Sequence, residues 1–259
     1  MEDLVRAAVD TIRERFREPL SLDDLAQSVW VSKYHFLRMF TRVTGVTPGR
    51  FLGAVRLHEA KRLLLSTSLN VADVAARVGY TSAGSFTRRF TESVGLSPTR
   101  YRQLSLAPGG HPRRPALPAT GPAAAGPAAA AGPAVPARPT GSVTGALRTT
   151  GAELSRAYVG VFDGAILQGL PASWNTAGAP GRFTLARIPA GTWYIHAVAH
   201  GTPAAGGGPG PATLTATVGP VAVSGGTGRI LDITLSPMDW TRPPILLALT
   251  GMDLQPTAA

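Results

Sequence analysis

The sequence has no cysteine and is short of acidic residues. Without cysteine, a disulfide framework and any thiolate-ligated metal site are excluded, and the composition fits a reducing compartment. The 259 residues include 25 Lys and Arg but only 15 Asp and Glu, which gives a net charge of +10. Such an excess suits an anionic partner, such as nucleic acid, although arginine-rich and alanine-rich usage also follows from a GC-rich gene.

Long apolar runs are also missing. No stretch approaches the roughly 18 residues of a membrane-spanning helix, and the longest candidate is the run ILLAL at 245–249. The first ten residues are acidic and helical in pattern, unlike a signal peptide. We therefore expect a soluble, cytoplasmic protein.

Groupings of catalytic residues are lacking as well. We find no Ser/His/Asp arrangement, and the GGGPG around Gly208 lacks the lysine that follows a phosphate-binding loop. His196 and His200 would share a strand face but stand about 13 Å apart at 3.3 Å per residue, too far for one metal ion. The sequence therefore predicts no enzyme, no cofactor and no metal site.

The charge and the apolar spacing divide the chain into three parts. Residues 1–104 have 16 Lys and Arg against 10 Asp and Glu, residues 105–140 have 3 against none, and residues 141–259 have 6 against 5. Apolar residues repeat at helical spacing in the first part, Pro, Ala and Gly fill the second, and the third alternates. We predict an all-α domain at 1–104, a flexible linker at 105–140 and an all-β domain at 141–259.

The stretch 70–101 predicts a helix, a tight turn and a second helix. Asn70 suits the first N-cap, Gly79 suits a left-handed turn, and Thr81 or Ser82 suits the next N-cap. Apolar residues of the second helix recur at i, i+4 and i+8, at Phe86, Phe90 and Val94. Its other face is polar and includes Arg88, so the pattern indicates a helix-turn-helix with a basic second helix.

An earlier stretch repeats this pattern at a constant offset. Six pairs of positions match: Phe36 with Phe86, Arg38 with Arg88, Phe40 with Phe90, Gly45 with Gly95, Pro48 with Pro98, and Phe51 with Tyr101. This duplication resembles the AraC/XylS family of transcriptional regulators, whose DNA-binding unit has two helix-turn-helix subdomains joined by a long helix. The resemblance covers about residues 4–104 and implies a sequence-specific transcription regulator, with double-stranded DNA as its partner. We expect an activator, and the sequence itself leaves activation and repression open.

The joining helix is predicted from Pro48, at the N1 position, to about Ser66. Its length of roughly 28 Å at 1.5 Å per residue is close to the ~34 Å repeat of B-DNA, so it can set two recognition helices in successive major grooves. Its polar residues His58, Lys61 and Arg62 are expected to face solvent.

The resemblance implies a DNA-binding set on the two recognition helices: Ser32, Lys33, Tyr34, Leu37, Arg38, Ser82, Ala83, Gly84, Thr87 and Arg88. Each arginine can bond guanine O6 and N7 together, whereas Lys33 is placed for phosphate. Leu37 either packs or meets a thymine methyl. Because Ala83 and Gly84 are small, we expect looser readout by the second helix.

Two aromatic side chains near the first recognition helix are expected to pack rather than to bind. Trp30 lies in a turn one residue shorter than its counterpart, at a position where glycine is common, which leaves its backbone geometry open. We expect its ring to pack under the helix that follows. His35 is also assigned to packing.

After Gly141, short runs rich in β-branched and aromatic residues predict about seven strands and a β-sandwich. The segment 183–195, with its Pro-x-Gly turn before an aromatic strand, resembles the carboxypeptidase-regulatory-like, prealbumin-like sandwich. The apolar run at 245–249 must be covered by its own sandwich, by the helical domain or by a second protomer.

Two functions remain open for the whole chain. In the first, a DNA-binding transcription regulator carries a C-terminal sandwich that senses an unknown effector or mediates assembly as a homodimer, with RNA polymerase as a further partner. In the second, the sandwich is an enzyme-associated or carbohydrate-binding module that the helical domain tethers to DNA. The duplicated motif favours the first.

Overall fold

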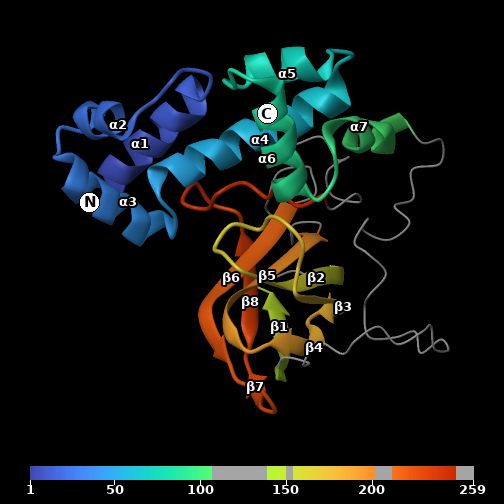
Figure 1. The fold of residues 1–259 in the computed structure, drawn as a ribbon. Helices are drawn as coiled ribbons and strands as arrows, with labels where there is room; N and C mark the ends of the chain where they lie inside the picture. The colour runs from blue at the N-terminus through green and yellow to red at the C-terminus, as the bar shows by residue number, and fades with distance from the viewer. Residues whose placement is uncertain (107–138, 150–153, 202–211, 249–259) are drawn as a thin grey trace. The chain divides into compact units, whose positions relative to one another are not determined.

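The structure, a computed structural model, describes residues 1–106, 139–149, 154–201 and 212–248 (Figure 1). It divides into two compact units. The first unit contains the described residues of 1–116, 166–170 and 239–257, and the second contains those of 117–165 and 171–238. Most of the predicted linker, residues 107–138, lies outside the described residues.

The first unit is helical, as predicted. Its helices are α1 (Glu2–Arg15), α2 (Leu22–Ser28), α3 (Lys33–Thr44), α4 (Pro48–Ser66), α5 (Val71–Arg77), α6 (Ala83–Val94) and α7 (Pro98–Leu106). Side-chain caps set several of these boundaries: Ser21 and Asp24 form a capping box on α2, and Asn70 accepts a bond from the Asp73 N–H on α5. Ser82, not Thr81, caps α6.

The same aromatic ladder fills the core of both helix-turn-helix copies. Phe40 contacts Phe36 and Phe51 with ring centroids 5.5 and 5.6 Å apart. Phe90 contacts Phe86 and Tyr101 at the same two distances. All six rings are buried, so the sequence repeat is a repeat of packing.

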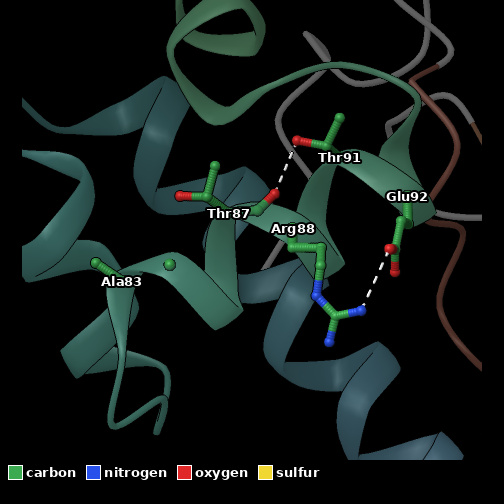
Figure 2. A pocket seen from close by; sticks show the side chains of 6 residues that line it. Ala83, Thr87, Arg88, Thr91 and Glu92 are labelled. Carbon is green, nitrogen blue, oxygen red and sulfur yellow. Dashed lines mark hydrogen bonds and ion pairs between the residues drawn. The ribbon is translucent and has the colours of Figure 1, made fainter.

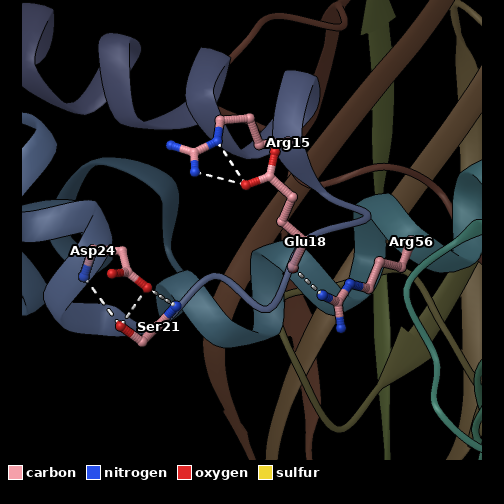
Figure 3. A network of polar contacts seen from close by, with 5 residues as sticks. All are labelled: Arg15, Glu18, Ser21, Asp24 and Arg56. Atoms are coloured by element: carbon pink, nitrogen blue, oxygen red, sulfur yellow. Dashed lines mark hydrogen bonds and ion pairs between the residues drawn. The ribbon is translucent and has the colours of Figure 1, made fainter.

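Arg56 of α4 fixes the long helix to the connection between α1 and α2 (Figure 3). Its Nε donates to the Phe16 carbonyl and its Nη2 to the Glu18 carbonyl, both at 2.7 Å. Partial burial lowers the pKa of this arginine below its ordinary value, and it stays cationic at neutral pH. The Glu18 carboxylate accepts two bonds from Arg15, which holds the same connection to α1.

Two segments from later in the sequence complete the first unit. The Gly169 N–H donates to the Ser93 carbonyl at 2.7 Å, and the Ala248 N–H donates to the Val94 carbonyl at 3.0 Å. These bonds satisfy carbonyls at the C-terminal end of α6, which the helix itself leaves without donors. We call 166–170 and 239–248 the capping segments.

Lys61 is buried beneath the second capping segment, so the expectation that it faces solvent is wrong. Its side chain is only 4% exposed, and Nζ donates to the Ile245 carbonyl at 3.3 Å and the Leu247 carbonyl at 3.2 Å. The ammonium also lies 5.6 Å from the centre of the Tyr101 ring. Burial is tolerated because oxygen acceptors and a ring face replace water around the charge.

The apolar run at 245–249 is covered within the first unit. Leu246 and Leu247 are each 1% exposed, and both of their N–H groups donate to the carbonyl of Leu167 in the other capping segment. Of the three covers that the sequence left open, the structure therefore selects the helical domain. Leu249 lies outside the described residues.

The second unit is built from eight strands in its described residues. They are β1 (Thr140–Thr149), β2 (Leu154–Phe162), β3 (Ser173–Ala179), β4 (Gly181–Pro189), β5 (Gly191–Gly201), β6 (Ala212–Val223), β7 (Gly228–Ile230) and β8 (Ile233–Pro237). The strand β3 was not predicted, because SWNTAGA lacks an alternating apolar pattern. The two β-branched runs that begin at 212 and 220 merge into the single strand β6.

These strands form one nearly closed sheet, and the predicted β-sandwich is not confirmed. Their order is β3-β2-β5-β6-β8-β1-β4, and β7 pairs with β1. The ends of this order are bridged by side chains: Ser173 Oγ donates to the Ala186 carbonyl at 2.8 Å, and Asn175 Nδ2 donates to the Thr184 carbonyl at 3.0 Å. The sheet surrounds a core of Val, Leu, Ile, Ala and Phe side chains.

His196 has a structural role in this unit. It is buried, with Nδ1 3.0 Å from Thr217 Oγ1 and Nε2 2.9 Å from the Gly164 carbonyl. Among the described residues, no group of three or more His, Cys, Asp or Glu side chains could hold a metal ion. None of the helices described is long and apolar enough to cross a membrane.

Candidate nucleic-acid interface

Both helix-turn-helix turns begin with the same backbone geometry at the helix end. After α5, Gly79 has φ +83° and donates to the Ala76 carbonyl, while Tyr80 donates to the Ala75 carbonyl. After α2, Trp30 has φ +57° and donates to the Gln27 carbonyl, while Val31 donates to the Ala26 carbonyl. Each turn is a Schellman motif, with a left-handed residue just past the helix end.

The expectation that Trp30 packs under α3 is wrong. Its side chain is 94% exposed. The preceding residue, Val29, is buried instead.

The helix α3 presents most of its predicted DNA-binding residues to solvent. The Ser32 hydroxyl oxygen accepts the His35 N–H at 3.4 Å and thereby caps the helix. Lys33, Tyr34 and Arg38 are exposed, and Leu37 is half-buried. His35 is also exposed, so its assignment to packing is wrong: Phe36 and Met39 take the buried positions of that face.

An ion pair and a ring contact orient Lys33 at the start of α3. Its Nζ lies 3.5 Å from Asp23 Oδ1 on α2 and 5.9 Å from the centre of the Tyr34 ring. Both charged side chains of the pair are about half exposed, so the pair is weak and Lys33 is free to exchange Asp23 for a phosphate.

The corresponding face of α6 is an open groove (Figure 2). It is lined by Ala83, Gly84, Thr87, Arg88, Thr91 and Glu92. Ser82 caps the helix by accepting the Ser85 N–H at 3.3 Å. A Cβ built on Gly84 would have Ser82 Oγ, at 3.7 Å, as its nearest neighbour, so small residues leave this end of the groove empty.

Glu92 distinguishes the two recognition helices electrostatically. Arg88 Nη1 lies 3.6 Å from Glu92 Oε1, one helical turn away. At the matching place in α3, Arg38 is followed one turn later by Arg42, an exposed cation. The sequence analysis missed Glu92, although aligning the two repeats pairs it with Arg42 as the equivalent position. The field around α3 is therefore the more favourable for phosphates.

Replacing Glu92 with glutamine is expected to raise DNA affinity about two- to fivefold, because it removes a negative charge beside phosphates and releases Arg88. A titration of labelled duplex at fixed salt measures this effect. The matched control is Glu59→Gln, which breaks the Glu59–Arg62 pair on α4. Equal gains from both variants would mean that only net charge matters.

The comparisons identify the class of the helical unit. A family model described as a helix-turn-helix domain matches residues 25–104. The chain is 35% identical over 103 residues to the bifunctional transcriptional activator/DNA repair enzyme AdaA of Bacillus subtilis, covering 40% of this chain and 47% of that protein. It is 39% identical over 83 residues to the HTH-type transcriptional activator AarP of Providencia stuartii, covering 32% and 62%.

A third relative is the lactose operon transcription activator of Staphylococcus xylosus, 30% identical over 98 residues, with 38% of this chain and 35% of that protein covered. An AraC-type DNA-binding domain-containing regulator from Chromobacterium violaceum has a solved structure, 28% identical with a TM-score of 0.40, covering 42% of this chain and 96% of that one. The chain thus spans less than two thirds of the length of each of these curated relatives. Its N-terminal unit is a helix-turn-helix DNA-binding domain.

Proposed function

We propose that this protein is a transcriptional activator that binds a specific DNA sequence by inserting α3 and α6 into two successive major grooves. The observation that carries the proposal is the duplicated exposed face, in which Arg38 and Arg88 occupy matching positions on two similarly capped helices. Two relatives of this unit are named as transcriptional activators. The 19-residue α4 between the copies supports the spacing of the two grooves.

The two helices are proposed to contribute unequally. The first has exposed Lys33, Tyr34 and Arg38, with Arg42 beyond them, and supplies most of the base readout and phosphate attraction. The N-terminal end of the second has only the small residues Ala83 and Gly84, and its Arg88 forms an ion pair with Glu92. Its half-site is read mainly by Thr87 and Arg88.

The second unit is proposed to sense an effector or to mediate assembly. Its near-neutral charge and its apolar core give no reason for it to bind DNA. A carboxypeptidase-regulatory-like sandwich remains our prediction for its fold family, and a homodimer formed through this unit also remains a prediction. RNA polymerase remains a predicted partner of the protein as a whole.

Arginine substitutions test the readout. Arg38→Ala is expected to weaken binding to a selected operator by about 1–3 kcal/mol and to relax preference at one base pair. Arg88→Ala is expected to do the same to a smaller extent. Lys33→Ala should lower affinity for all duplexes alike and reduce the salt dependence.

The matched control is Arg229→Ala on β7, an exposed arginine outside the helical unit. Competition between the operator and single-mismatch duplexes reports the preference of each variant. Wild-type discrimination in both Arg38→Ala and Arg88→Ala would rule out base readout by these side chains.

A further inference from the structure

Trp30 adopts a backbone conformation that is unfavourable for a bulky residue. Left-handed backbone geometry is unfavourable for a residue with a Cβ, and bulky residues adopt it least. The indole is also 94% exposed, so it stabilises no core. At the matching position of the second copy, glycine adopts the same turn. The fold therefore gives no reason for tryptophan here.

In the second copy, Gly79 is needed both because the backbone φ is positive and because a side chain there would have no room. A Cβ built on Gly79 would lie 2.7 Å from the Arg17 carbonyl oxygen. Trp30 has no such neighbour, since its side chain is almost fully exposed. The two turns thus have different surroundings: the second is closed against the connection from α1, and the first opens to solvent.

The exposed indole lies at the end of the turn that leads into α3. Two residues separate it from Lys33, whose ammonium lies over the Tyr34 ring, and Tyr34 is 74% exposed. Two exposed aromatic rings and a cation therefore precede or begin the helix whose N-terminal residues enter the major groove in helix-turn-helix complexes. An indole N–H can donate to a phosphate oxygen, and its ring can pack on a deoxyribose.

We propose that Trp30 contacts the sugar–phosphate backbone beside the half-site that α3 reads, and that this contact accounts for a tryptophan in a glycine geometry. The inference rests on the proposed function of α3. Phosphate and sugar contacts position a protein without reading sequence. Trp30 therefore contributes affinity for every duplex, and Arg38 contributes preference among them.

Three substitutions separate the ring from the backbone geometry. Trp30→Gly removes the ring and relieves the φ +57° geometry, so stability should rise while affinity falls about tenfold for operator and unrelated duplex alike. Trp30→Ala should lose the same affinity without gaining stability. Trp30→Phe keeps a ring and should lose at most a few-fold, because only the N–H donor is gone.

The measurement uses the full chain and two duplexes of equal length, one selected from a random pool and one unrelated, with thermal unfolding of each variant alongside. Arg187→Gly is the matched control: Arg187 has φ +56° and is exposed in the second unit, so it should gain stability without changing DNA affinity. Wild-type affinity in Trp30→Gly overturns the proposal and leaves the indole for a protein partner. If Arg38→Ala still loses discrimination in that case, the proposed function stands; a full chain that selects no duplex overturns both.

Discussion

Replacing Gly79 with alanine is expected to lower the free energy of unfolding of the helical unit by about 2–4 kcal/mol. The φ of +83° alone costs alanine roughly 1–2 kcal/mol. The new methyl group would also lie 2.7 Å from the Arg17 carbonyl oxygen and 3.1 Å from the Phe16 carbonyl oxygen, so backbone must move. Arg56 holds the Phe16 and Glu18 carbonyls, which resists that movement.

Gly45→Ala is the control for this substitution. Gly45 has φ +76°, and a Cβ there would meet nothing within 4 Å, so it should cost only the conformational part of the loss. Urea unfolding followed by far-ultraviolet circular dichroism compares the two. DNA affinity should fall further in Gly79→Ala, because the α5–α6 turn packs on the connection before α2 and sets one copy against the other. Equal losses in stability and affinity would show that the close approach to Arg17 is unimportant.

The helical unit was predictable because its local signals agree with each other. Ser21, Asn70 and Ser82 cap the helices that their sequence context indicates, and Pro48 begins α4. The aromatic repeat then fixes how each helix packs, since the same rings meet in both copies. Local propensity, capping and periodicity all favour one structure here.

Side-chain exposure was harder to predict where tertiary contacts decide it. Nothing in the sequence around Lys61 indicates burial. The carbonyls of Ile245 and Leu247, almost two hundred residues later, and the ring of Tyr101 replace water around its ammonium group. Trp30 was assigned to packing because large aromatic side chains are usually buried. The exposure of its ring depends on what surrounds the turn: a Cβ on the equivalent Gly79 would meet the Arg17 carbonyl, whereas Trp30 is almost fully exposed.

For the candidate DNA-binding set, the sequence predicted which arginines are exposed but not which charged side chains lie beside them. The resemblance located Arg38 and Arg88, and both are exposed. The ion pair between Arg88 and Glu92 depends on the rotamers of both side chains as well as on their i,i+4 spacing. The sequence alone therefore shows that the pair can form, but not that it does. In the second unit, β3 was missed because a strand at the end of a sheet order needs no strong apolar alternation.

Removing the buried side chain of Leu247 is expected to destabilise the helical unit, although this residue lies far beyond the helices of that unit in the sequence. Leu247 is 1% exposed, and Leu→Ala changes at such sites cost about 2–5 kcal/mol. Its carbonyl accepts from Lys61, and its neighbour Ala248 caps α6 through the Val94 carbonyl. Destabilising this segment should therefore destabilise both α4 and the C-terminal end of the second recognition helix, α6.

Native-state hydrogen exchange of the full chain measures this effect unit by unit, which matters because two units need not unfold together. Leu247→Ala should lower amide protection in α4 and α6 and leave β5 and β6 unchanged. Ile230→Ala is the apolar control: Ile230 is 83% exposed on β7, so its loss should stay within about 0.5 kcal/mol. A fragment of residues 1–106 lacks both capping segments and should be less protected in α6 than the full chain, because the Ser93 and Val94 carbonyls lose their donors. Full protection of α6 in that fragment, together with a neutral Leu247→Ala, would show that the helical unit is stable without them.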